Sequence, residues 1–274
     1  METIRVLLIG DVVGAAGCAM IQKHLDKLKQ QLNINAVILN GENSSRGRGI
    51  TPKNVRFFRH NGVDVVTSGN HIWRHKDIYS YLKEHNDLLR PANFPASAPG
   101  VGVTTFLVGT HRIGVINLQG RIFMKELADC PFRAADSILT YLKDKTNIIL
   151  VDFHAEATSE KMAMAFYLNG RVSGVVGTHT HVQTADERIL PGGTGYITDL
   201  GMTGSFNSML GMKKEGIIET FLTTLPTKFT PDTAHPLVMS GVWMEIDTNT
   251  GKTLKIQRVM LFDHELPVGG SEDE

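Results

Sequence analysis

The feature that most constrains this fold is an alternation of short apolar runs and helical patterns over the first 71 residues. The apolar runs lie at 4–10, 36–39 and 63–67. Each is short and ends at glycine or polar residues, as buried strands do. Apolar residues recur at helical spacing over 17–32, and Thr51-Pro52 combines an N-cap residue with proline at the first helical position. Alternating strands and helices of this kind predict a parallel sheet with crossover helices.

The remainder of the chain is richer in strands. We expect a hairpin at 101–108 and 111–117, further strands at 148–153, 172–176, 194–198, 237–246 and 253–262, and helices at 132–143 and 213–224. Late strands with no helix between them favour an α/β sandwich of two mixed β-sheets flanked by helices over a purely doubly wound fold. The sequence shows no internal repeat. We therefore predict a single domain over 1–268, followed by a disordered acidic tail at 269–274.

Composition narrows the class of partner. The 28 Lys and Arg balance the 28 Asp and Glu, so no extended nucleic-acid-binding surface is expected. A small phosphorylated substrate would need local positive charge, which metal ions can supply. Two cysteines, Cys18 and Cys130, match neither a disulfide framework nor a zinc motif. The N-terminal apolar run is too short for a signal peptide or a membrane span, which predicts a cytoplasmic protein without membrane contact.

Polar residues that can bind metals follow the predicted strands. They are Asp11, Glu42, Asn43, Asn70, His71, His154, His179 and His181. Open α/β sheets bind ligands outside the carboxyl ends of their strands, so these side chains are expected to meet in one crevice. Each has an ordinary interpretation when taken alone, such as a helix cap, a turn or a hydrogen-bonded interior histidine. The prediction of a metal site therefore depends on their convergence.

The most specific segment is Gly177-Thr178-His179-Thr180-His181, because its two histidines alternate. If the segment is extended, both imidazoles point the same way and could serve two adjacent ions. A surface loop is the alternative. Mixed carboxylate, amide and imidazole ligands suit Fe, Mn, Zn or Co better than soft metals. A carboxylate such as Glu42 can bridge two ions.

Two other functional classes remain open. Gly10 to Gly17 lies between a predicted strand and a helix, as a dinucleotide-binding loop does. It lacks the G-x-G-x-x-G order, no P-loop Lys-Ser/Thr pair follows, and Asp11 would repel a phosphate, so this interpretation is disfavoured. NAD or FAD retained on purification would support it. The other class is a regulatory binding module, for which activity would be incidental.

These motifs resemble those of the calcineurin-like metallophosphoesterases and, within that superfamily, the bacterial YmdB-like proteins. The resemblance is carried by residues 9–14, 40–43, 69–71, 90–95, 152–160, 176–186 and 197–204. Two departures from the wider superfamily stand out. Val13 occupies the position of the histidine in Asp-x-His, and Glu42 takes the place of the bridging aspartate.

The resemblance implies two metal ions, iron first, with manganese or zinc as alternatives. One ion would be bound by Asp11, Glu42, Asn43 and His181, and the other by Glu42, Asn70, His154 and His179. His71 would be the catalytic proton donor. The implied activity is hydrolysis of a small phosphodiester, with 2′,3′-cyclic nucleotides as leading substrates, by a homo-oligomer. A regulatory role in gene expression is the alternative.

Further residues near these motifs are expected to assist. Asp152 and Glu156 are placed to orient a ligand histidine, a common role for carboxylates beside a metal site. Arg90, Asn93 and Arg121 lie in polar segments that we expect to be exposed loops, where they could hold substrate.

Overall fold

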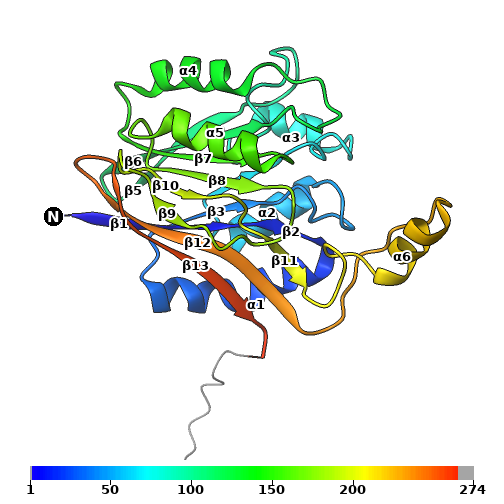
Figure 1. Ribbon diagram of the computed structural model, residues 1–274. Coiled ribbons are helices and arrows are strands. Elements are labelled where there is room, and N and C mark those ends of the chain that lie inside the picture. The colour runs from blue at the N-terminus through cyan, green and yellow to red at the C-terminus, as the bar shows by residue number, and fades with distance from the viewer. Residues whose placement is uncertain (1, 265–274) are drawn as a thin grey trace, which may run out of the picture.

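A computed structural model describes residues 2–264. Two β-sheets pack face to face, and helices cover their outer faces, with α4 and α5 on one side and α1 on the other (Figure 1). The predicted α/β sandwich of two mixed sheets is therefore confirmed. The single domain predicted over 1–268 stays a prediction, and the tail at 269–274 lies outside the described residues. No helix in the described part of the chain is long and apolar enough to cross a membrane.

The first sheet contains the N-terminal strands. Its strands are β1 (Thr3–Ile9), β2 (Asp11–Val12), β3 (Ala36–Asn40), β4 (Val65–Thr67), β11 (Met202–Ser205), β12 (Leu237–Asp247) and β13 (Thr253–Phe262). β1, β3 and β4 run parallel, as predicted. β12 is antiparallel to β1 and β11 along one edge and to β13 along the other. The late strands thus extend the N-terminal sheet, which makes it mixed.

The second sheet is built from the middle of the chain. Its strands are β5 (Val103–Val108), β6 (His111–Gln119), β7 (Ile148–His154), β8 (Gly174–Thr178), β9 (Arg188–Ile189) and β10 (Gly195–Ile197). β6, β7, β8 and β10 run parallel, and β5 and β9 are antiparallel edge strands. The predicted hairpin at 101–108 and 111–117 is therefore confirmed as β5 and β6.

The helices lie close to their predicted positions, with two additions. They are α1 (Gly14–Leu32), α2 (Pro52–His60), α3 (Ile78–Glu84), α4 (Pro131–Leu142), α5 (Thr158–Leu168) and α6 (Lys214–Thr223). Thr51 and Asn54 form a capping box at the start of α2. α1 begins three residues before its predicted start, and α3 and α5 were not predicted.

Strand alternation places a polar layer beneath the predicted site. On β7, Ile148 and Leu150 face the first sheet and belong to the core between the two sheets. Because side chains alternate along a strand, Asp152 and His154 continue on that same face. Asp152 accepts hydrogen bonds across the sheet interface from Asn40 Nδ2 at 3.0 Å and Thr67 Oγ1 at 2.5 Å. The apolar core therefore ends in polar residues at the carboxyl edge of both sheets.

Candidate metal centre

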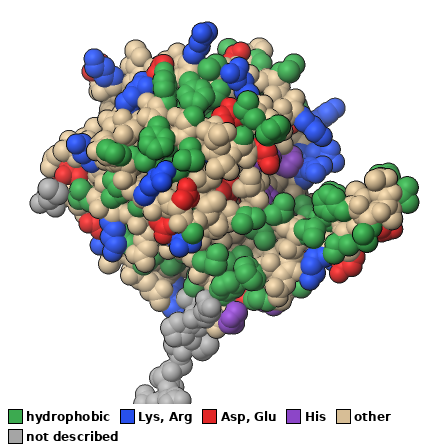
Figure 2. Space-filling view, in the orientation of Figure 1, with side chains coloured by type: hydrophobic (Ala, Val, Ile, Leu, Met, Phe, Trp, Pro, Cys, Tyr) green, Lys and Arg blue, Asp and Glu red, His purple; other side chains and the backbone are tan. Residues whose placement is uncertain are grey.

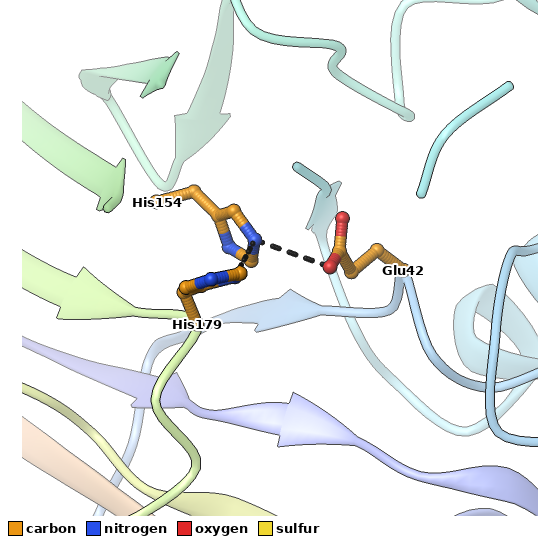
Figure 3. Close-up of side chains that lie close together, drawn as sticks. All are labelled: Glu42, His154 and His179. Carbon is orange, nitrogen blue, oxygen red and sulfur yellow. Dashed lines mark hydrogen bonds and ion pairs between the residues drawn. The ribbon is translucent and has the colours of Figure 1, made fainter. Parts of the chain in front are cut away.

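The predicted ligands come from the ends of five strands and converge at one edge of the sandwich. Asp11 opens β2, Glu42 follows β3, Asn70 follows β4, His154 ends β7 and His179 follows β8. Glu42, His154 and His179 each offer a ligand atom, and these atoms lie within 4.8 Å of one another (Figure 3). Asn70 Oδ1 faces the same point, 3.1 Å from His154 Nε2.

A second group of polar atoms lies around Asp11. His181 Nε2 lies 3.7 Å from Asp11 Oδ1 and 3.1 Å from Asn43 Nδ2. Asp11 Oδ2 also accepts a hydrogen bond from the His179 backbone at 3.1 Å, which ties the two groups together. Asn43 Oδ1 points the other way and accepts from His71 Nδ1 at 2.7 Å. To bind a cation beside Asp11, the Asn43 amide must turn its oxygen towards His181.

The backbone of residues 179–181 is not in the extended conformation that would place both imidazoles on one side of a strand. His179 and His181 have φ angles of 101° and 66°, in the left-handed region that non-glycine residues rarely adopt. Asp199 holds Thr180 between them, accepting from its backbone N–H at 3.2 Å and its Oγ1 at 2.7 Å. Both imidazoles therefore reach the site from a tight loop, and the alternation of a strand is not the cause.

Burial and charge together set the ionisation of this cluster. Burial alone would raise the pKa of Glu42, but the neighbouring His154 and His71 hold that pKa well below its usual range. Burial opposes the charged form of His154, yet Glu42 outweighs it and raises the His154 pKa to about 9. Burial and the charge of His154 lower the pKa of His179 to about 3, and burial raises the pKa of Asp11. Glu42 is thus held ionised by its pairing with the histidines, and a bound cation would take the place of the proton on His154.

Of the two carboxylates expected to assist, Glu156 contacts a histidine directly and Asp152 reaches one through a threonine. Thr178 Oγ1 lies 2.9 Å from His154 Nδ1 and donates to Asp152 Oδ1 at 2.7 Å. The threonine oxygen therefore accepts a hydrogen bond from His154 Nδ1. Nε2, which faces Glu42, is then the nitrogen that can bind a cation once its proton leaves. Glu156 Oε2 lies 3.1 Å from His179 Nε2. Asp152 therefore acts on His154 through Thr178, whereas Glu156 touches His179 directly.

These residues fit a metal ion on the evidence of their own geometry. Glu42 Oε1 is buried and lies 3.1 Å from His154 Nε2, yet no described group donates a hydrogen bond to it. His154 Nε2 also lies 3.0 Å from His179 Nδ1. Two imidazole nitrogens and a carboxylate oxygen facing one point are the donors that borderline divalent cations prefer. A cation would satisfy all three.

The prediction that Arg90 and Asn93 are exposed loop residues is wrong. Arg90 is 6% and Asn93 2% exposed. Arg90 donates to the Pro91 carbonyl at 2.7 Å, and Asn93 donates to the Gln119 and Asp129 carbonyls. Both residues hold loop backbone in place, since a buried loop must satisfy its polar groups.

Two exposed arginines at this edge were not predicted as site residues. Arg121, which was predicted to hold substrate, remains a candidate for that role. Arg121 is exposed, as expected, and its backbone N–H donates to Glu160. Arg48 and Arg74 also line clefts at the metal-site edge, and both side chains are exposed. Their position depends on the loop that follows Glu42, for which the sequence offers only the flanking Gly47 and Gly49.

Comparison with known proteins identifies the family of this chain. A model of the family described as YmdB-like protein matches residues 7–259. The chain belongs to the YmdB-like family. A relative from Bacillus subtilis strain 168, named 2′,3′-cyclic-nucleotide 2′-phosphodiesterase, is 47% identical over 260 residues, which are 95% of this chain and 98% of the relative.

Solved structures extend the comparison to the fold. One similar structure is the crystal structure of a novel phosphatase from Mycoplasma pneumoniae. It has a TM-score of 0.90 and 35% identity, covering 96% of this chain and 94% of that one. A candidate 5′-nucleotidase from Staphylococcus aureus shares the fold alone, with a TM-score of 0.61 and 16% identity, covering 96% of this chain and 55% of that chain. The predicted calcineurin-like fold is confirmed.

Proposed function

We propose that this chain is a dinuclear metal-dependent phosphodiesterase that opens 2′,3′-cyclic nucleotides, the activity named for the Bacillus subtilis relative. The observation that carries the proposal is the convergence of Glu42, His154 and His179 donor atoms within 4.8 Å at the edge of both sheets. Structural metals are generally enclosed by their ligands, whereas catalytic ones keep an open position. Here Glu42 and His179 line a cleft of about 440 Å³, so a substrate can reach the site.

The two groups of ligands support one ion each. Asp11, Glu42, Asn43 and His181 would hold the first, and Glu42, Asn70, His154 and His179 the second. Bound ions of this kind supply Lewis acidity and lower the pKa of bound water. Oxygen and nitrogen donors without thiolate suit iron, manganese or zinc alike, and the family resemblance puts iron first.

The residues around the ions have separate roles in the reaction. Thr178 fixes the His154 tautomer, and Glu156 orients His179. His71 is the proton donor: its Nδ1 lies 3.2 Å from Glu42 Oε1, and this contact orients the ring. A water molecule loses one proton to solvent as its oxygen bonds to phosphorus, and the bond from phosphorus to O2′ breaks. O2′ takes a proton from His71 Nε2, and His71 regains a proton from solvent. The product keeps its phosphate on O3′.

Location and assembly belong to the same proposal. We expect a cytoplasmic homo-oligomer. Helix α6 supports the assembly because none of its residues is buried, and it carries Leu222, which is 80% exposed. An isolated ten-residue helix is marginal in water, so an apolar partner surface would stabilise it. Light scattering coupled to size exclusion measures the mass, and a monomer at micromolar concentration would contradict this part.

The decisive test of the activity joins metal content to turnover. Mass spectrometry of the native protein should find about two metal ions per chain. Hydrolysis of adenosine 2′,3′-cyclic phosphate and bis-(p-nitrophenyl) phosphate should disappear on chelation and return with added metal. Glu42→Gln should lower both metal content and activity. A metal-free preparation with full activity would refute the proposal.

A further inference from the structure

Two grooves of different character meet at the candidate metal centre. The first, of about 440 Å³, contains Glu42, His179 and His181. The second, of about 380 Å³, contains Asn70 and again His179. Because His71 and Arg48 also line both grooves, a ligand whose scissile group reaches the ions can extend into each.

The first groove has an apolar wall. It is lined by Met209, Leu210, Met212, Ile217, Phe221 and Phe229. Phe221 and Phe229 are 79% and 45% exposed, so their ring faces are available to a ligand. Figure 2 shows hydrophobic side chains running from the body of the molecule along the projecting α6 arm. Exposed aromatic rings beside a phosphate-binding site are typical of surfaces on which nucleobases stack.

The second groove is basic. Arg48, Arg74 and Lys125 line it, against the single acidic residue Glu126. Their exposed side chains form no hydrogen bond or ion pair with any other residue in the range 2–264. Figure 2 shows Lys and Arg side chains gathered beside a histidine on this side of the molecule. In a chain with no net charge, such a cluster favours an anion next to the site.

We propose that the substrate is the 3′ end of a short RNA that carries a terminal 2′,3′-cyclic phosphate. The terminal base would stack on Phe221 and Phe229, and the phosphate on the 5′ side of the terminal ribose would bind Arg48, Arg74 and Lys125. A cyclic mononucleotide has no such phosphate and leaves the basic groove empty. This inference rests on the proposed phosphodiesterase function and adds the substrate class.

Three substrates show whether the phosphate in the basic groove must be part of an RNA chain or can be a 5′-terminal phosphate. They are adenosine 2′,3′-cyclic phosphate, its 5′-phosphorylated form, and the dinucleotide ApA with a 2′,3′-cyclic end. We expect kcat/KM at least about tenfold higher for the dinucleotide than for the mononucleotide, the gain typical of a hydrogen bond to a charged group. A gain for the 5′-phosphate form shows that a terminal phosphate also suffices. Equal values for all three would overturn the inference while leaving the proposed function intact, and no hydrolysis of any would overturn both.

Variants locate the two subsites. Arg74→Ala should remove the gain of the dinucleotide and leave kcat/KM for the mononucleotide unchanged, whereas the nearby exposed Lys76→Ala should change neither. Phe221→Ala should raise KM about tenfold for the mononucleotide. It should not change KM for glycerol 1,2-cyclic phosphate, which has no base. Phe166→Ala, which removes an exposed aromatic ring on α5 outside both grooves, is its control. A dinucleotide gain that survives Arg74→Ala would contradict the basic subsite.

Discussion

At the scale of single residues, His71 separates metal binding from chemistry. Its Nδ1 contacts Asn43 and Glu42, which leaves Nε2 directed away from those two oxygens. We predict that His71→Ala keeps its metal content and loses about 10²–10⁴ in kcat, the range for a removed general acid. Steady-state kinetics and metal analysis check this. His60→Ala, at the exposed end of α2, should behave as wild type. Normal turnover of His71→Ala would refute the assignment.

Gly69 is required because the His154 ring lies where its side chain would be. A Cβ at this position would lie 2.1 Å from His154 Cδ2 and 2.3 Å from Nε2. We predict that Gly69→Ala displaces the ring, lowers metal affinity and reduces kcat/KM about 100-fold, because small misplacements of reacting groups are costly. At Gly204 the same change meets only ordinary contacts at 3.5 Å or more, so Gly204→Ala is the matched control. Equal metal affinity in both variants would contradict the prediction.

At the scale of elements, the connection from β8 to β10 carries two predicted ligands, His179 and His181, and Asp186 fastens this connection to the end of β10. This carboxylate accepts from Thr184 Oγ1 at 2.6 Å and from Thr198 N at 3.1 Å and Oγ1 at 2.5 Å. Burial would raise the pKa of Asp186, but these hydrogen bonds lower it below 3.8. A depressed folded pKa contributes stability above the unfolded pKa, and that stability is lost as pH falls through the folded value.

We therefore predict that Asp186→Asn lowers the melting temperature at pH 7, and that the difference from wild type shrinks as pH falls below about 3.8. Thermal unfolding at several pH values measures this. Asp144→Asn, at an exposed position, should show little change at any pH. A difference that grows on acidification would have the wrong sign and would exclude this role for Asp186.

Some helices and strands could be predicted from the sequence, and others could not. Apolar strands such as β1 and β7 were predictable because a buried strand needs a short apolar run. Helix α5 was missed because its buried face includes Glu160 and Lys161, which conceal the apolar periodicity. Lys161 Nζ binds Asp199 at 2.6 Å, and Glu160 accepts backbone N–H groups from Arg121 and Ile122. Those partners are distant in sequence, so no local pattern reveals them.

At the scale of the whole molecule, the sequence was enough to predict that the ligands meet at one edge. It was not enough to predict the form of the grooves around them. Parallel strands bring their carboxyl ends to one edge, so Asp11, Glu42 and His154 could be grouped from sequence alone. The left-handed turn at His179 depends on Asp199 and has no glycine to mark it. The apolar and basic grooves depend on loops and on the α6 arm, whose positions follow from contacts between remote segments.

A metal shared by both sheets should stabilise the entire fold. Asp11 and Glu42 belong to the first sheet and its loops, whereas His154 and His179 come from the second. The unfolded chain has no preformed site, so binding energy appears as folding stability. At free metal 100 times Kd the gain is about 2.7 kcal/mol, which raises the melting temperature by roughly 5–10 °C for a chain of this size. Calorimetry of chelated and reloaded protein measures the shift, and Glu42→Gln should show little of it. An identical melting temperature with and without metal in wild type would mean that no ion links the two sheets.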